Sequence, residues 1–342
     1  MAARIAGIGK YLPRRVLTNA DLEKMVETSD QWIVDRTGIR ERRMAAADET
    51  AATMGSEAAR MALETAGIEP KDVDLVICAT CSPDGMFPAT ASLIQDALGA
   101  SNAGAFDVNA ACVGFLSALA TGAQFINAGV YQRVLVIGSE VLSRITNWSD
   151  RGTCVLFGDG AGAVVLEAAE RGGPTSFFLK SDGGGAKVLY ARGPGSSPLS
   201  VTEAEGYCIV MNGSEVFRFA VRAMEDAARQ AVKAAGLTLD DIAYVVPHQA
   251  NQRIISAVAK AMRLPADRFI VNVEKYGNTS SASIPLALCE AWEEGKLKDG
   301  DHLVFVSFGG GLAWGASVVD WTAIGPREGA SARQNASRPA PA

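Results

Sequence analysis

The chain has only two histidines, His248 and His302, among 342 residues, so any imidazole chemistry must use one of these positions. Its six cysteines are too few for a disulfide scaffold and predict a reduced, cytoplasmic protein. No apolar run reaches the roughly 18 residues that a membrane-spanning helix requires. The short, glycine-broken apolar start around Ile5 predicts a first strand rather than a signal peptide.

Basic residues are not in excess either. The 32 Lys and Arg against 38 Asp and Glu give a formal charge of −6, which argues against a nucleic-acid partner. The glycine-rich turn Phe157–Gly162 lacks the spacing of a dinucleotide-binding fingerprint, and no phosphate-loop motif occurs. The pair Cys78 and Cys81 lacks the second pair that a zinc site needs, and a turn rather than a helix follows it, which disfavours a redox pair. We therefore expect neither a metal nor a redox cofactor.

What is present is the pattern of a large α/β core. Hydrophobic residues make up 48% of the chain, and short, almost wholly apolar runs predict strands that are buried on both faces of a sheet. Amphipathic stretches that end at glycine predict helices between them. The expected strands include residues 73–79, 134–138, 242–246, 269–273 and 303–308, and the expected helices include residues 53–65, 90–98 and 216–235.

The order of these elements recurs along the chain. Ala66–Ile77 resembles Ala235–Val246, at an offset near 170 residues. Such self-similarity predicts two similar α/β halves, which we place at residues 1–172 and 173–323. The remaining residues 324–342, rich in Gly, Ala, Ser, Arg and Pro, predict a disordered tail. A site shared by both halves would collect residues at the carboxyl ends of strands.

Cys112 lies at such a junction, between an apolar strand ending near Phe106 and a helical pattern over Leu116–Ile126. A helix N-terminus offers unpaired N–H groups and the positive end of the helix dipole. We expect this environment to favour the nucleophilic thiolate. The alternative is a buried structural cysteine, which is what most free cysteines are.

Two further polar residues interrupt apolar elements in the second half. His248 lies in the run Pro247–Asn251, between a predicted strand and a helix, and Asn278 lies in a loop that leads from the predicted strand 269–273 into a helix. We therefore expect His248 and Asn278, like Cys112, at the carboxyl ends of strands. The alternatives are a buried, hydrogen-bonded histidine and an asparagine that caps a helix. Near the N-terminus, Trp32 stands among arginines, which suits either an aromatic ligand carrying phosphates or a solvated charged turn.

A set of stretches spanning about residues 4 to 320 follows the order of one known family. They are Asp30–Val34, Arg36–Arg42, the Cys112 element, Asp150–Thr153, Phe157–Gly162, Pro247–Asn251, Tyr276–Ser280 and Phe308–Gly311. On these residues the sequence resembles β-ketoacyl-acyl-carrier-protein synthase III of the thiolase superfamily. The resemblance implies a thiolase-like fold in which the two halves form a five-layer αβαβα unit.

The resemblance also implies a reaction. Cys112 would take an acyl group from a short acyl-CoA primer, such as acetyl-CoA, with the oxyanion held by the backbone N–H groups of Cys112 and Gly310. Malonyl-acyl carrier protein would then lose CO₂, and its enolate would attack the acyl group to give 3-oxoacyl-acyl carrier protein and CoA. His248 and Asn278 would donate hydrogen bonds to the thioester oxygen on which the charge develops. The reaction would start type II fatty acid synthesis without a cofactor.

Binding residues follow from the same resemblance. Trp32 and Arg151 match residues that sandwich the CoA adenine, and the positions that match other CoA contacts are Thr28, Arg36 and Asn251. Arg253 and Lys260 match a basic face for carrier-protein docking, and Ser214 stands where relatives can carry a basic residue. Phe87 matches a residue that crosses a homodimer interface and closes the partner's acyl pocket, which suggests short primers.

Several alternatives stay open at this stage. Relatives that load unusual acyl groups in secondary metabolism keep Cys, His and Asn and are the runner-up. Chain-elongating synthases use a second His where this chain has Asn278, and thiolases use a second cysteine that the Phe308–Gly311 turn lacks. A papain-like hydrolase also uses Cys, His and Asn, but its local cysteine signature is absent. A non-catalytic carrier-protein-binding relative is disfavoured because all three polar residues are retained.

Overall fold

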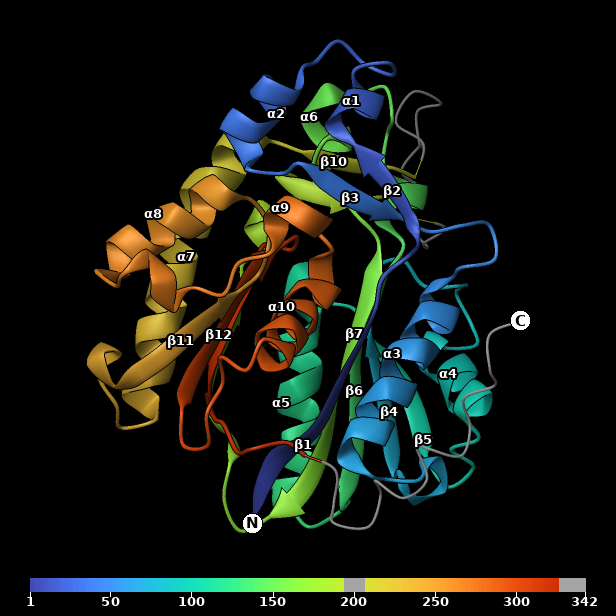
Figure 1. The fold of residues 1–342 in the computed structure, drawn as a ribbon, viewed down its shortest axis with the longest axis vertical. Coiled ribbons are helices and arrows are strands. Elements are labelled where there is room, and N and C mark those ends of the chain that lie inside the picture. Colours follow the sequence, from blue (N-terminus) through green and yellow to red (C-terminus); the bar gives the residue numbers. More distant parts are fainter. Residues whose placement is uncertain (194–206, 326–342) are drawn as a thin grey trace.

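The structure, a computed structural model, describes residues 1–193 and 207–325. Two sheets lie side by side with two helices between them, and further helices cover the outer face of each sheet (Figure 1). The central helices are α5 (Gly114–Asn127) and α10 (Ser283–Glu293), and the outer ones are α3 (Ala51–Ala66), α4 (Thr90–Leu98), α7 (Gly213–Ala234) and α8 (Gln252–Met262). This confirms the predicted five-layer αβαβα arrangement.

The first sheet has the strand order β1-β7-β6-β4-β5. Its strands are β1 (Ala2–Tyr11), β4 (Leu75–Ala79), β5 (Gly104–Val108), β6 (Arg133–Glu140) and β7 (Gly160–Ala169). β4 is parallel to β5 and to β6, whereas β7 is antiparallel to both of its neighbours. Every residue of β4 is buried, as expected for a strand covered on both faces by helices.

The second sheet repeats this topology in the order β11-β12-β13-β8. Its strands are β8 (Gly173–Ser181), β11 (Ile242–Pro247), β12 (His302–Gly309) and β13 (Ala313–Asp320). β11 and β12 are parallel and the other pairs antiparallel, so the four strands correspond in order and direction to β4, β6, β7 and β1. The two similar halves are therefore present, while residues 326–342 of the predicted tail lie outside the described residues.

The predicted strand at residues 269–273 is wrong. Phe269 forms a single bridge with Val245, and only the next amide, that of Ile270, donates to the Val245 carbonyl, at 2.9 Å. The side chain of Gln249 replaces the rest of the ladder, because its Oε1 accepts from the N–H groups of Asn272 at 2.9 Å and Val273 at 3.1 Å. A side chain from another segment thus decides the backbone path here, and an apolar pattern cannot reveal that.

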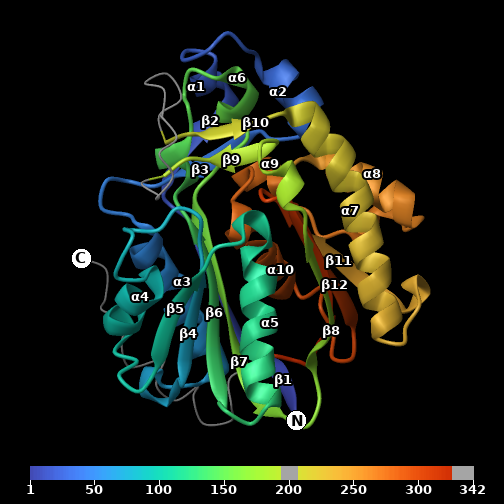
Figure 2. The ribbon, with the colours of Figure 1, turned by 180° about the vertical axis from the view of Figure 1, so that it is seen from behind.

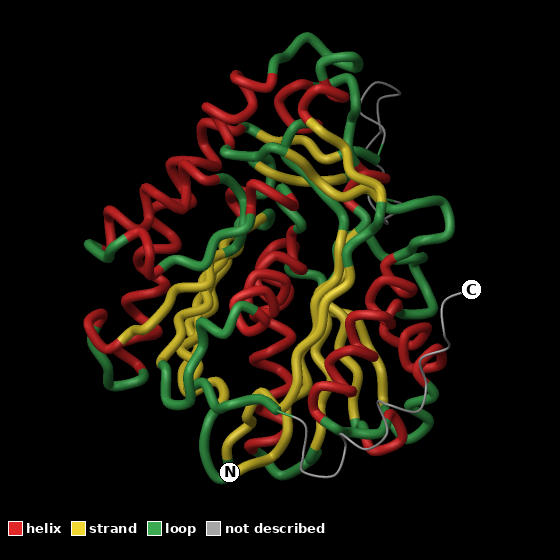
Figure 3. The backbone as a smooth tube through the Cα atoms, in the orientation of Figure 1, coloured by secondary structure: helices red, strands yellow, loops and turns green. Residues whose placement is uncertain are grey.

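Smaller elements gather at one end of the molecule, above the ends of both sheets (Figures 2 and 3). They are β2 (Arg15–Thr18), β3 (Glu41–Met44), β9 (Leu189–Ala191), β10 (Ile209–Met211), α1 (Asn19–Leu22), α2 (Asp30–Thr37), α6 (Arg151–Cys154) and α9 (Val273–Tyr276). α2 starts with a cap from Ser29 and ends at Gly38, whose φ of 75° suits glycine. A Cβ on Gly38 would lie 2.5 Å from the Cβ of Gln252, so this glycine lets α2 pack closely on α8.

Of the helices in the described ranges, none combines the length and apolar character needed to cross a membrane. All six cysteines, each within those ranges, are free.

Candidate active site

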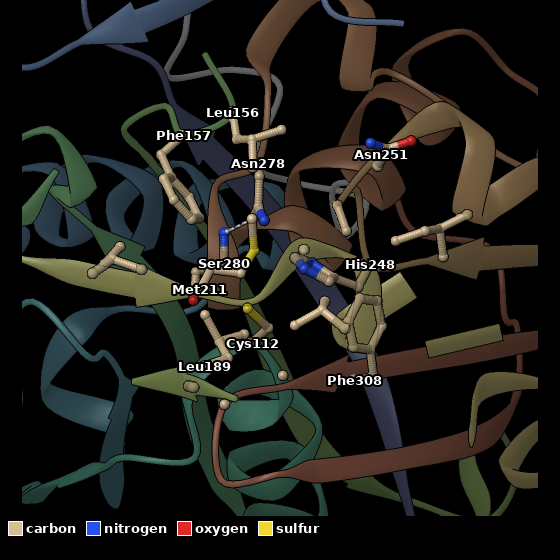
Figure 4. Close-up of a pocket in the computed structure, with 18 of the residues that line it drawn as sticks. Cys112, Leu156, Phe157, Leu189, Met211, His248, Asn251, Asn278, Ser280 and Phe308 are labelled. Atoms are coloured by element: carbon tan, nitrogen blue, oxygen red, sulfur yellow. Dashed lines mark hydrogen bonds between the residues drawn. The ribbon is translucent and has the colours of Figure 1, made fainter. Parts of the chain in front are cut away.

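Cys112 lies in a short 3₁₀ turn (Ala111–Val113) that joins the end of β5 to the start of α5. The preceding residue Ala111 has a φ of 45°, in the left-handed region that non-glycine residues seldom adopt. The Ser307 hydroxyl donates to the Cys112 carbonyl at 2.7 Å and ties this turn to β12 of the second half. The predicted strand-to-helix junction is confirmed, and Figure 4 shows the thiol facing the pocket.

The triple-glycine turn at the end of β12 lies directly against Cys112. A Cβ on Gly309 would lie 2.9 Å from both the N and the Cβ of Cys112, so only glycine permits this approach. A Cβ on Gly310 would lie 3.0 Å from the Leu189 carbonyl oxygen. The turn therefore lies beside the Cys112 backbone, where the resemblance predicts an oxyanion hole, and the role of the Gly310 N–H stays a prediction.

The expected preference for thiolate at Cys112 is wrong for the unliganded site. Burial raises the pKa of the Cys112 thiol to about 12, against which a hydrogen bond with the Ser280 hydroxyl acts only in part, and the Glu140 carboxylate raises it further. The free-energy cost of desolvating the thiolate thus exceeds the stabilisation that the N–H groups and dipole at the start of α5 provide. At neutral pH the group is therefore a thiol.

His248 follows β11 directly, and its backbone N–H donates to the Val306 carbonyl at 2.8 Å. The residue is 1% exposed, and its ring lies edge-on to Phe308, with the ring centroids 5.7 Å apart. Burial lowers the pKa of His248 to about 3, so the imidazole is neutral at physiological pH. Its Nδ1 has no hydrogen-bond partner among the described residues. A neutral imidazole can donate from one nitrogen and accept at the other.

Asn278 does not end a strand, contrary to the prediction, but follows α9 and Gly277. Its backbone bridges to Phe157, because its N–H donates to the Leu156 carbonyl at 2.8 Å and its carbonyl accepts from Gly158 at 3.0 Å. The side-chain Oδ1 accepts from the Ser280 N–H at 2.9 Å (Figure 4). Since Oδ1 is engaged, the amide nitrogen is the group left to donate into the pocket.

These three residues line one cavity of about 1190 Å³ that is built from both halves. Other lining residues come from α2, α7, α8 and the triple-glycine turn. The structure thus brings the three candidate catalytic side chains together, as Figure 4 shows. Among the described residues, no three His, Cys, Asp or Glu side chains gather in a way that could hold a metal ion.

Trp32 lines the cavity, and two arginine side chains lie close to its ring. The Cζ atoms of Arg36 and Arg151 lie 4.8 and 4.9 Å from its ring centroid, and Arg151 also donates to the Glu27 carbonyl at 2.9 Å. The two residues predicted to sandwich the CoA adenine therefore lie side by side, and their role as an adenine site stays a prediction.

The other predicted CoA contacts differ in whether their polar side-chain atoms already have hydrogen-bond partners in the protein. Asn251 caps α8 by accepting from the Arg253 N–H at 2.8 Å, and its amide donates to the Arg36 carbonyl at 3.1 Å. Thr28 has a buried Oγ1 without a hydrogen-bond partner among the described residues. Asn251 therefore serves the structure as a cap as well as lining the cavity.

Arg253 and Lys260 are both exposed on α8, seven residues apart, which places them on one helix face. Arg218 on α7, which the sequence analysis did not single out, is exposed and lines the cavity together with Arg253. Ser214 lies one turn before Arg218, so the mouth does carry a basic residue on this helix. Phe87 is 86% exposed and does not line the cavity of its own chain.

Glu140, Ser280 and Ser281 are further residues that the sequence analysis missed. Glu140 ends the apolar strand β6, and the serines form a turn directly after Asn278. The available signal in the sequence was a glutamate at the end of a wholly apolar strand. Burying a carboxylate is costly unless hydrogen-bond donors or an opposite charge stabilise it.

Comparisons with known proteins agree with this geometry. The family model for the 3-oxoacyl-[acyl-carrier-protein (ACP)] synthase III C terminal matches residues 232–321, and the model for 3-oxoacyl-[acyl-carrier-protein (ACP)] synthase III matches residues 106–183. β-Ketoacyl-[acyl-carrier-protein] synthase III of Caldanaerobacter subterraneus subsp. tengcongensis is 49% identical over 94% of this chain and 98% of the relative. The enzyme of the same name from Symbiobacterium thermophilum is 52% identical over 93% and 97%.

Solved structures give the same picture. The β-ketoacyl-[acyl carrier protein] synthase III from Thermus thermophilus superposes with a TM-score of 0.89 at 48% identity, covering 93% of this chain and 99% of that one. The priming β-ketosynthase from the R1128 polyketide biosynthetic pathway also has a TM-score of 0.89, but at 37% identity, covering 95% and 97%.

The two-half fold, with a cavity that holds Cys112, His248 and Asn278, and the similarity to these relatives define a condensing enzyme of the acyltransferase type. Within that class, identity near 50% over almost the whole chain decides the family. The chain belongs to the 3-oxoacyl-[acyl-carrier-protein] synthase III family.

Proposed function

We propose that this chain condenses a short acyl-CoA primer with malonyl-acyl carrier protein, releasing CoA and CO₂ and starting type II fatty acid synthesis. The observation that carries the proposal is the meeting of Cys112, His248 and Asn278 in one cavity whose lining also includes Trp32. The runner-up, an enzyme that loads an unusual acyl group in secondary metabolism, is not favoured. The relatives near 50% identity carry the synthase III name, whereas the polyketide priming enzyme is 37% identical.

In the first step the Cys112 sulfur attacks the thioester carbon of the acyl-CoA. A C–S bond forms to Cys112, the bond to the CoA sulfur breaks, and the proton lost by Cys112 ends on the departing CoA. Because the pKa of the free thiol is raised to about 12, proton loss must accompany attack. The oxyanion is stabilised by the N–H groups of Cys112 and Gly310, and one such donor typically contributes about 3 kcal/mol.

In the second step the malonyl thioester loses CO₂, and its bonding electrons form an enolate. His248 and Asn278 donate hydrogen bonds to the enolate oxygen. Neither needs to change charge for this, since the pKa of His248 lies near 3 and an amide does not titrate. The enolate carbon then attacks the acyl carbonyl, and Cys112 leaves and recovers a proton. The chain's own residues supply every group, so we propose that no cofactor takes part.

Carrier protein and CoA would approach through the same mouth. Trp32 and Arg151 suit the adenine of CoA, Arg36 and Asn251 line the same cavity as Trp32, and Thr28 would be a further CoA contact. The exposed Arg253 and Lys260 on α8, joined by Arg218 on α7, suit an acidic carrier protein.

A homodimer would use the free edge of the first sheet. In the described residues, β5 has a neighbour on one side only, so its other edge offers unpaired backbone groups. Met86 and Phe87, 71% and 86% exposed, lie in the loop between β4 and α4, and a partner's acyl pocket would cover Phe87. The free cysteines support a reducing, cytoplasmic setting.

The test is intact-protein mass spectrometry after mixing with acetyl-CoA, and separately with longer and branched acyl-CoAs. We expect a mass gain of one acetyl group that is absent in Cys112→Ser, and weaker gains as the primer lengthens. A preference for a long or unusual acyl group would support the secondary-metabolism reading instead. No adduct from any acyl-CoA would contradict the proposed function.

A further inference from the structure

Glu140 is a charged residue buried beside the nucleophile. It closes strand β6 and is 0% exposed. Among the described residues its charge is met by hydrogen-bond donors, with no ion pair to a basic side chain. An unpaired buried carboxylate is costly unless its oxygens are satisfied, so this arrangement needs an explanation.

The two carboxylate oxygens hold two different segments. Oε2 accepts from the Ser82 hydroxyl at 2.6 Å and from the Cys81 N–H at 3.0 Å, in the loop after β4. Oε1 accepts from the Ser281 hydroxyl at 2.8 Å and from the Ser281 N–H at 3.4 Å, in the 3₁₀ turn that precedes α10. The Cys81 thiol lies 3.4 Å from both oxygens. Glu140 thus clamps a loop of the first half to a turn of the second.

The turn that Glu140 holds, Ser280–Ser281, contacts the side chains of the candidate active site. Ser280 directs the Asn278 amide through its N–H, its hydroxyl lies 3.7 Å from the Cys81 sulfur, and its interaction with Cys112 acts to lower the pKa of that thiol. The φ of Ser280 is 47°, a conformation that a serine keeps only when its surroundings hold it. A Cβ on Gly138 would lie 2.4 Å from the Ser281 carbonyl oxygen, so the β6 backbone also presses on this turn.

We propose that Glu140 is a positioning residue for the condensing reaction: its buried carboxylate holds the Ser280–Ser281 turn so that Asn278 and Ser280 stay aimed at the reacting atoms. The inference rests on the proposed function. The negative charge of Glu140 also acts on the Cys112 thiol. The groups around that thiol are Glu140 from β6, Cys81 after β4, Ser280 before α10 and the neutral His248 after β11.

The test compares wild type with Glu140→Gln. An amide keeps the shape but offers one acceptor oxygen, so its NH₂ must face either the Ser82 side or the Ser281 side, where donors already point. We expect decarboxylation of malonyl-carrier protein to fall at least about tenfold, because small misplacements at a reacting centre cost that much. The KM for acyl-CoA should stay within about twofold, since the cavity mouth is untouched.

A second readout separates charge from shape. Alkylation of Cys112 by iodoacetamide, followed by mass spectrometry of its peptide across a pH series, reports the thiol's ionisation without any acyl substrate. Removing the negative charge of Glu140 should move the midpoint of Cys112 alkylation to lower pH. A displaced Ser280–Ser281 turn with the charge retained should not move the midpoint in that direction. If wild type forms no acyl adduct, the proposed function fails, yet this comparison still tests Glu140.

Glu167→Gln is the matched control, because Glu167 is another buried carboxylate of the same sheet, on β7, bonded to Arg4 and Arg133 instead. It should change neither decarboxylation nor the midpoint. If Glu140→Gln does not fold, Ser281→Ala carries the test, since it removes one donor and keeps the charge. It should slow decarboxylation about threefold or more without lowering the midpoint. A folded Glu140→Gln that matches wild type in both readouts, or a Ser281→Ala with the wild-type rate, overturns the inference.

Discussion

The buried imidazole of His248 makes the stability of this protein depend on pH in a way that one substitution can isolate. An ordinary histidine has a pKa of 6.5, and burial lowers that of His248 to about 3. Below pH 6.5 the unfolded chain binds a proton that the folded chain binds only near pH 3. Stability is therefore complete above pH 6.5 and is lost progressively as the pH falls from 6.5 toward 3.

The magnitude follows from the shift. Each pKa unit corresponds to about 1.4 kcal/mol, so the whole interval is worth roughly 5 kcal/mol. Between about pH 7.5 and about pH 5.0, His248 alone should remove about 2 kcal/mol from the free energy of unfolding. Other groups titrate over the same range, so the quantity to measure is the difference between wild type and His248→Gln, in which that proton site is gone.

The assay is urea denaturation at several pH values in this range, at one protein concentration. The free energy of unfolding of wild type minus that of His248→Gln should fall by about 2 kcal/mol from about pH 7.5 to about pH 5.0. His302→Gln is the control for losing a histidine as such, since His302 is partly exposed and pairs with Asp320 at 2.7 Å. A difference between wild type and His248→Gln that does not change with pH would refute a neutral, desolvated His248.

Two further predictions concern the ligand site and the nucleophile. Trp32→Ala removes the ring that Arg36 and Arg151 flank and should raise the KM for acyl-CoA about tenfold with little change in kcat, as steady-state kinetics can check; an unchanged KM would contradict the predicted adenine site. Gly309→Ala places a Cβ 2.9 Å from the Cys112 backbone and should slow acyl-adduct formation at least about tenfold, whereas Gly183→Ala, where a Cβ meets nothing within 4 Å, should not; equal adduct rates would show that the turn tolerates the methyl group.

The sequence by itself determined the architecture and the position of Cys112 at a strand-to-helix junction. Wholly apolar strands such as Leu75–Ala79 require burial on both faces, and glycines such as Gly67 end helices in a conformation that other residues avoid. The recurrence of this pattern predicted the two halves. The change from apolar strand to helical pattern around Cys112 fixed the junction, because both periodicities are local properties of the chain.

Other features were decided by contacts between distant segments, which local patterns do not contain. The path of residues 269–273 depends on the Gln249 amide, and the protonation of Cys112 depends on how far the folded chain excludes water from it. The clamp by Glu140 joins residues that lie 58 and 141 positions away. Charge state and side-chain aim are set by burial and by donors brought together on folding, so only the tertiary structure could decide them.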